Sequence, residues 1–194
     1  MTGPKADDAG AADRDSQAHG TSRPPRRSAR TKAVEAVATR YFDALVARDT
    51  PAMAAFWHAE GVEDQVPTGI LRGPEGVKGF FDELFAALPD MEYTVDRITA
   101  GPETAAVQWR GRGTFDGGPF AGVEPTGRTI ELRGVDVLEV DGDGAITRNT
   151  VYFDGAAFAR GAGMLPSDGS AADRAMKTAF NGVTKLRKVV EGLR

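Results

Sequence analysis

The sequence predicts an α+β domain in which helices come first and long strands follow, with a separate C-terminal helix. Three observations support this fold class. Apolar residues recur at helical spacing as far as Pro89, the pattern then changes to alternation, and a second helical pattern follows residue 170. A run of helices before a run of strands favours an α+β arrangement. The chain of 194 residues is long enough for one such domain with tails.

Three helices are predicted in the first half of the chain, with one short strand between the second and the third. An apolar stripe predicts the first helix over residues 31–48, with Tyr41 pointing inward. A proline suits the first turn of a short second helix that ends at residue 57. A third helix is expected over residues 74–87, where a broad aromatic face includes Phe81.

Alternating apolar residues and turn residues predict the strands. We expect them at residues 62–66, 93–95, 105–114, 129–140 and 145–154. The last two form a hairpin around the turn at residues 141–144. Residues 111–127 are rich in Gly and Pro and are expected to form a long connection. The final helix is amphipathic, with large apolar residues at helical spacing.

Two aspartates occupy strand positions that usually carry apolar side chains. Alternation places Asp64 on the face of Val62 and Val66, and it places Asp136 on the face of Leu138. Burying a lone carboxylate is costly, so such a group becomes neutral, finds partners or lines a cavity. We therefore expect a pocket with acid/base groups. The alternative is a pair of structural aspartates bonded to backbone amides.

Composition excludes several classes of function. A net charge of −4 gives no sign of nucleic-acid binding. The chain has no cysteine and only two histidines, so thiolate and histidine-rich metal sites are excluded, and we expect no metal and no cofactor. No apolar run reaches the length of a membrane span, and the final helix carries charges of both signs, so we expect a cytoplasmic protein without a membrane partner. Residues 1–30 lack large apolar side chains and are expected to be a disordered tail.

Four segments resemble ketosteroid isomerases of the nuclear transport factor 2-like superfamily. They are YFDAL at 41–45, GVED at 61–64, GVDVL at 134–138 and DGAI at 143–146. The resemblance implies a cone-shaped α+β barrel, with three N-terminal helices packed on a strongly bent, mostly antiparallel sheet. It also matches Tyr41 and Asp136 to that family's oxyanion-hole tyrosine and protonated aspartic acid, and Asp64 to its general base.

A second set of segments is similar to SnoaL-like polyketide cyclases and ester cyclases. These are GTF at 113–115, Gly122, PTGR at 125–128, YFD at 152–154 and LP at 165–166. The resemblance covers residues 31–166 and leaves the C-terminal segment 167–194 outside the domain. It matches Asp154 to an acidic residue that those cyclases use for proton transfer. Phe115 stands where they commonly have a histidine, which is a departure from their pattern.

Together these features predict a cofactor-independent enzyme of secondary metabolism that acts on a hydrophobic cyclic or polyketide-derived ketone. It would remove a proton next to the carbonyl and so catalyse cyclisation or isomerisation. Asp64 or Asp154 would be the base, while Tyr41 with Asp136 would hold the enolate oxygen. The residues expected to line the substrate pocket are Trp57, Phe81, Trp109 and Phe115.

Two other functions fit the same fold class. The pocket would bind a small molecule without turnover, or the protein would be a limonene-type epoxide hydrolase in which Arg133 or Arg148 bridges two aspartates. We also expect a homodimer formed through the outer face of the sheet. The apolar residues assigned to that face are Val135, Val137, Val151 and Phe153.

Overall fold

The structure is a computed structural model and describes residues 28–192. The elements in chain order are α1 (Ala29–Val46), α2 (Thr50–Ala54), β1 (Trp57–Gln65), β2 (Gly69–Arg72), α3 (Gly73–Ala87), β3 (Glu92–Ala100), β4 (Thr104–Phe115), β5 (Arg128–Val140), β6 (Ile146–Phe153), α4 (Gly155–Gly161) and α5 (Ala171–Glu191). Nearly all of the tail expected at residues 1–30 lies outside the described residues. The α+β fold class is confirmed, and strands β1 and β2 lie between α2 and α3.

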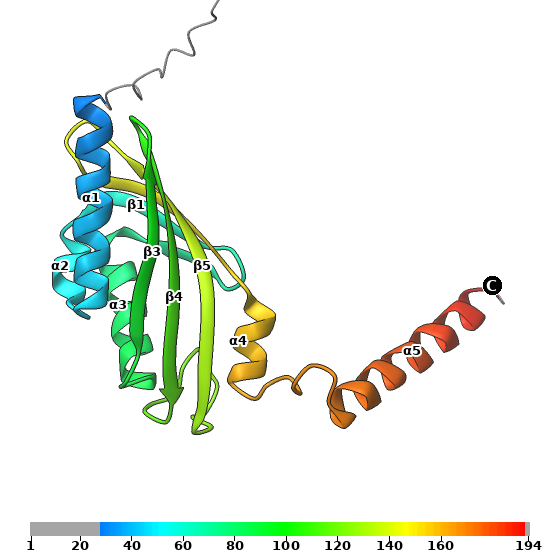
Figure 1. The fold of residues 1–194 in the computed structure, drawn as a ribbon. Helices are drawn as coiled ribbons and strands as arrows, with labels where there is room; N and C mark the ends of the chain where they lie inside the picture. The colour runs from blue at the N-terminus through cyan, green and yellow to red at the C-terminus, as the bar shows by residue number, and fades with distance from the viewer. Residues whose placement is uncertain (1–27, 193–194) are drawn as a thin grey trace, which may run out of the picture.

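The six strands form one sheet in the order β2-β1-β6-β5-β4-β3. Every neighbouring pair is antiparallel except β1 and β6, which run parallel. Helix α1 contacts β3, β4 and β5, and α3 contacts β1 and β2, so these helices cover one face of the sheet (Figure 1). The buried apolar residues lie between that face and the helices.

Local sequence accounts for where the first helices begin. The Ser28 hydroxyl accepts a hydrogen bond from the backbone N–H of Thr31, which caps α1. The Asp49 carboxylate caps α2 in the same way, and Pro51 lies in its first turn. Helix α3 turns Phe81 and Leu84 toward the core, as the apolar pattern predicts.

The strand predicted at residues 105–114 is confirmed, so the long connection predicted over residues 111–127 was wrong in its first part. Strand β4 continues to Phe115, and Gly111 and Gly113 lie within it. A Cβ on Gly111 would lie 2.7 Å from the Met91 side chain, and one on Gly113 would lie 3.0 Å from the Met91 sulfur. These glycines therefore allow Met91 to pack closely on the strand, a role that sequence alone did not separate from that of a loop glycine.

The face assigned to the expected dimer was also wrong in part. Cross-strand partners point to the same side of a sheet, and Val151 pairs with Asp136, so Val151 faces the inside. Phe153 lies two residues further along β6 on that same face. Val135 and Val137 do lie on the outer face, where Tyr152 is 52% exposed.

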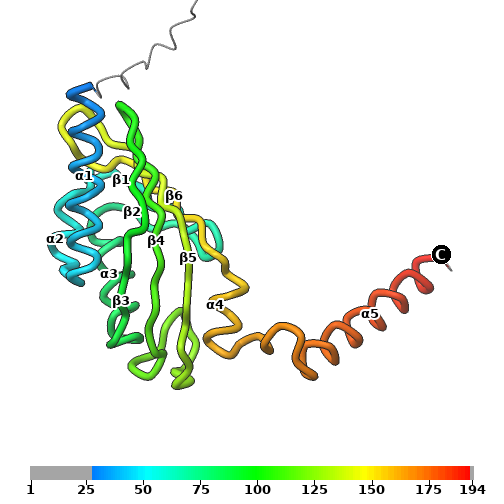
Figure 2. Tube along the Cα trace, viewed as in Figure 1, coloured from blue at the N-terminus to red at the C-terminus, as the bar shows by residue number. Residues whose placement is uncertain are grey.

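Two short elements were not predicted, and the last helix stands apart from the rest. These are strand β2 and helix α4. Helix α5 extends away from the sheet after the segment that follows α4 (Figure 2). Within residues 28–192, no helix is both long and apolar enough to cross a membrane.

Candidate active site

A cavity of about 100 Å³ lies between α3 and the inner face of the sheet. Its lining residues come from nearly every element of the domain: Leu45, Gln65, Thr68, Phe80, Phe81, Leu84, Leu88, Met91, Tyr93, Trp109, Phe120, Ala121, Ile130, Leu132, Asp136, Val151, Phe153 and Phe158. Most are apolar, and Asp136 is the one carboxyl group among them. Phe158, from α4, packs against Phe120, from the loop between β4 and β5, with ring centroids 6.0 Å apart.

Asp136 is buried on the inner face of β5, as alternation predicts. Its two oxygens have different partners: Oδ1 accepts a hydrogen bond from Trp109 Nε1 at 2.6 Å, and Oδ2 accepts one from Asn149 Nδ2 at 2.7 Å. Burial raises the pKa of Asp136 to about 6, and the two hydrogen bonds oppose that rise. The result is a carboxyl group that changes charge close to neutral pH in an apolar cavity.

Gly134 makes the contact between Trp109 and Asp136 sterically possible. Trp109 and Gly134 are direct cross-strand partners in β4 and β5. A Cβ on Gly134 would lie 2.2 Å from the indole ring, which no real contact allows. The missing side chain lets the indole lie across β5, so that its N–H meets the carboxylate two residues further along the strand.

A second buried carboxyl group, Glu63 of β1, lies deeper than the cavity and has no exposed surface. Gln65 Nε2 donates a hydrogen bond to Glu63 Oε1, and the Tyr41 hydroxyl donates to Oε2 at 3.5 Å. Burial raises the pKa of Glu63 to about 8, and the nearby charge of Asp136 adds to the rise. At neutral pH, Glu63 is therefore mostly protonated and Asp136 is mostly ionised.

The sheet register explains why these polar groups meet. Glu63 is the cross-strand neighbour of Asn149 in β6, and Asn149 bonds to Asp136 in β5. Three adjacent strands thus present a row of polar side chains on one buried face. The Asn149 Oδ1 atom is buried without a hydrogen-bond partner among the described residues. A protonated Glu63 next to it would be a suitable donor.

Tyr41 points inward from α1 as predicted, but it contacts Glu63 and not Asp136. Burial, followed by the charges of Glu63 and Asp136, holds the pKa of Tyr41 well above its usual value. The tyrosine therefore stays a neutral hydroxyl donor. It does not line the cavity, and its place is in the layer behind Gln65.

The expectation that Asp64 faces the interior was wrong. Asp64 lies on the outer face of β1, where its carboxylate pairs with Arg148 at 3.1 Å. The buried positions of β1 include Trp57, Gly61 and Glu63, which are odd-numbered, whereas Asp64 is even-numbered and points to the other face. Val62 and Val66 are apolar but lie on the outer face with Asp64, and Val66 is 52% exposed. Asp64 is consequently separated from the cavity by the sheet.

Asp154 does not reach the cavity either. It is the N-cap residue of α4, and its carboxylate accepts hydrogen bonds from the backbone N–H groups of Ala156 and Ala157, both at 2.9 Å. This is the structural alternative considered for such aspartates, a carboxylate bonded to backbone amides. The structure thus brings neither proposed base together with Asp136.

The predicted pocket residues divide into two groups. Phe81 and Trp109 line the cavity, whereas Trp57 and Phe115 are buried in the core beside it. The arginines considered for an epoxide hydrolase are outside: Arg133 is exposed, and Arg148 binds Asp64 on the outer face. No arginine is found among the described residues that line the cavity.

Glu63, Gln65 and Asn149 were not identified from the sequence. A signal for Glu63 existed, because Trp57 shares its strand parity and a tryptophan is a better marker of the buried face than a valine near a turn. Asn149 gave no such signal, because its role depends on which strands become neighbours in space.

The sequence profile of the SnoaL-like domain matches residues 38–149. No curated protein sequence matches the chain significantly.

Solved structures of similar shape carry several names. A candidate SnoaL-like polyketide cyclase from Jannaschia sp. CCS1 is 22% identical, with a TM-score of 0.65, covering 73% of this chain and 99% of that one. AclR, a candidate hydroxylase from Streptomyces galilaeus, is 20% identical, with a TM-score of 0.62, covering 84% and 96%. An LEH-like epoxide hydrolase from M. tuberculosis is 20% identical, with a TM-score of 0.54, covering 69% and 92%. At these identities the likeness shows a shared fold and not a shared reaction.

Proposed function

Because the chain belongs to the SnoaL-like domain family of the nuclear transport factor 2-like superfamily, we propose that its cavity is the active site of an acid/base enzyme. The substrate would be a hydrophobic cyclic or polyketide-derived ketone, and the reaction would begin with removal of a proton next to the carbonyl. The observation that carries the proposal is the single carboxyl group of Asp136 in a mostly apolar lining.

Asp136 is the proposed base, in place of Asp64 or Asp154. Both of its partners are hydrogen-bond donors, so both favour the charged carboxylate over the protonated acid. A carboxylate with a pKa of about 6 is mostly ionised at pH 7 and still basic enough to accept a proton from an activated carbon. The apolar lining supports this role, because it keeps water from competing for the carboxylate.

The enolate oxygen formed in this step needs a hydrogen-bond donor. Gln65 is our candidate, because its side chain lines the same cavity and its amide is fixed by the bond to Glu63. Glu63 and Tyr41 would then be positioning residues that act through Gln65. Proton return from Asp136 to another carbon gives isomerisation. Attack of the enolate carbon on a second carbonyl, with the proton passing to the new alkoxide, gives cyclisation.

The experiment is exchange of α-protons of 2-tetralone in D₂O, followed by NMR. This two-ring ketone probes the first chemical step without requiring the natural substrate. We expect wild-type protein to accelerate exchange and Asp136→Asn to lose most of that acceleration. General base catalysis contributes roughly 10²–10⁴-fold, which sets the size of the loss.

Matched controls are Asp64→Asn and Asp154→Asn, which change the same functional group outside the cavity. Both should exchange at the wild-type rate. If wild type and Asp136→Asn both bind 2-tetralone but neither accelerates its exchange, the protein is a binding module without turnover. Equal loss in all three variants would reject the assignment of Asp136.

A further inference from the structure

Helix α5 exposes an apolar stripe that no other part of residues 28–192 covers. Its large apolar side chains are 40% to 70% exposed: Met176, Phe180, Val183, Leu186, Val189 and Val190. At 100° per residue they occupy about half of the helix circumference along its length. Water-exposed apolar side chains in such a continuous arrangement indicate an interaction surface.

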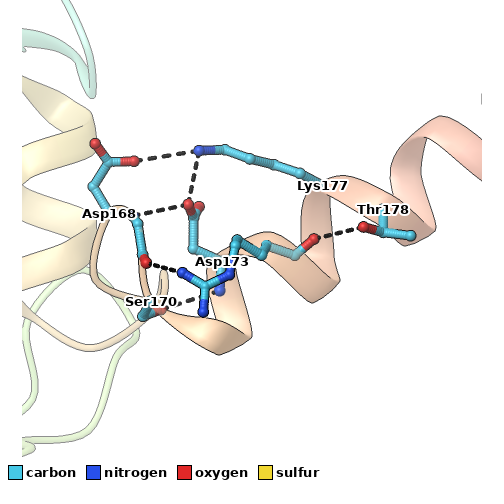
Figure 3. A network of polar contacts seen from close by, with 7 residues as sticks. Asp168, Ser170, Asp173, Lys177 and Thr178 are labelled. Atoms are coloured by element: carbon cyan, nitrogen blue, oxygen red, sulfur yellow. Dashed lines mark hydrogen bonds and ion pairs between the residues drawn. The ribbon is translucent and has the colours of Figure 1, made fainter.

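The other side of the helix is basic. Five lysines and arginines lie in α5, against Asp173 and Glu191 as the acidic residues. Asp173 is buried, where it accepts a hydrogen bond from the Gly169 backbone N–H and pairs with Lys177 at 2.7 Å (Figure 3). The Asp173 carboxylate therefore stabilises the first turn of the helix and does not add negative charge to its exposed face. Beyond Asp173, Lys185 and Lys188 lie on the exposed polar face and Arg187 lies at the edge of the apolar stripe, whereas the chain as a whole has a net charge of −4.

Contacts between neighbouring residues of the chain define the start of α5. The Ser170 hydroxyl caps the helix by accepting a bond from the Asp173 backbone N–H at 3.1 Å, and Lys177 also reaches Asp168 at 3.3 Å (Figure 3). The helix then runs clear of the sheet (Figure 1). Its apolar stripe is thus presented outward on an ordered element.

We propose that α5 binds the surface of an anionic lipid bilayer, with its apolar stripe inserted at the headgroup boundary. Amphipathic helices of low mean hydropathy with basic polar faces bind such surfaces through apolar burial and attraction to anionic lipid. Arg187 follows Phe180 by two turns, at the edge of the stripe, and its long stem can extend to the headgroups. A second copy of α5 packed in parallel would instead bring the cations at residues 185–188 together. The sequence predicted no membrane partner because the polar face of this helix carries charges of both signs. Asp173, one of its two acidic residues, is buried and paired, so the exposed face is more basic than the sequence suggested.

Membrane binding also suits the proposed chemistry. The segment 162–170 joins α5 directly to α4, whose Phe158 lines the cavity. A docked α5 would hold that end of the domain near the lipid, where an apolar ketone accumulates. Lipid binding itself does not depend on turnover, so it is tested separately.

The test is sedimentation of the full chain with vesicles of phosphatidylcholine alone or mixed with phosphatidylglycerol. We expect binding to the anionic vesicles that weakens as salt is raised. The triple variant Lys185→Gln, Arg187→Gln, Lys188→Gln should bind on the order of 100-fold more weakly, at about fivefold for each cation. The double variant Phe180→Ser, Leu186→Ser should also lose binding.

Matched controls make equal changes on the domain. Lys32→Gln, Arg97→Gln, Arg133→Gln removes three cations outside α5, and Val66→Ser, Ile70→Ser removes two exposed apolar side chains of the sheet. Both should bind like wild type, and circular dichroism checks that all variants fold. Absence of binding to anionic vesicles, equal binding to neutral ones, or equal loss in the controls would overturn the proposal. One further result would overturn it: the protein associates with itself but does not bind vesicles, and the double variant Phe180→Ser, Leu186→Ser no longer self-associates. The stripe would then bind a second copy of the chain.

Discussion

The indole N–H of Trp109 donates a 2.6 Å hydrogen bond to Asp136 from the neighbouring strand. This contact joins the two properties on which the proposed chemistry depends. It fixes the direction of the carboxylate in the cavity, and it supplies a donor that partly offsets the effect of burial on the pKa of Asp136. Together with Asn149, which bonds the other carboxylate oxygen, Trp109 and the glycine that makes room for its indole therefore determine the behaviour of the candidate base.

Gly134→Ala tests the steric part of this relationship. The new Cβ would lie 2.2 Å from the Trp109 ring, so the indole must move and its bond to Asp136 is lost. We expect the free energy of unfolding to fall by roughly 1–3 kcal/mol, as for other overpacked core positions. Urea unfolding followed by tryptophan fluorescence measures the change. Gly142→Ala is the matched control, because no atom lies within 4 Å of its added Cβ. Equal stability of the two variants would contradict the packing argument.

Glu63 should make the protein less stable as pH rises. Its pKa is raised from 4.5 to about 8 by folding, so the folded state keeps a proton that the unfolded chain has released. The stabilising effect is complete below pH 4.5 and is lost as the pH passes through about 8, with a slope of at most about 1.4 kcal/mol per pH unit. Asp136 acts in the same direction, but only up to about pH 6.

Glu63→Gln isolates this effect. Urea unfolding between about pH 6.5 and 8 should show a falling free energy of unfolding for wild type and a nearly flat line for the variant. Glu92→Gln changes an exposed carboxylate of β3 and should keep the wild-type slope. A variant with an unchanged slope would mean that Glu63 is ionised in the folded protein throughout this range.

Asp64→Ala should have little effect on either stability or activity. The ion pair of Asp64 with Arg148 is partly exposed on the outer face of the sheet. Pairs of this kind contribute less than about 1 kcal/mol, and no part of the pair reaches the cavity. Chemical unfolding together with 2-tetralone exchange checks both points. Loss of exchange in a folded Asp64→Ala protein would restore Asp64 as a candidate base.

The sequence was informative about the fold and about one half of the site. Asp136 was placed correctly because β5 alternates without interruption through the residues around it. Asp64 was misplaced because Val62 and Val66, which share its face, were taken to mark the interior, whereas that face of β1 is the outer one. Local periodicity describes which residues share a face, but the choice of the buried face belongs to tertiary packing.

The remaining features depend on contacts between distant segments. Glu63 is recognisable as a buried acid only once Tyr41, Gln65 and Asn149 are known to surround it. Helix α4 has seven residues and none of them is buried, so it has no apolar pattern to predict it. Asp154 was assigned to the site from the resemblance to SnoaL-like cyclases, and the capping role of its carboxylate becomes visible only with the helix that follows.

The most direct test of the central claim is the pH dependence of 2-tetralone exchange by wild type and Trp109→Phe. If Asp136 is the base, the wild-type rate should rise with a midpoint of about pH 6 and then level off. Removing the indole donor destabilises the carboxylate, so the midpoint of Trp109→Phe should move upward, to roughly pH 7. A profile with the same midpoint in both proteins, or one with no inflection between about pH 5 and 8, would contradict the assignment of Asp136 as the base.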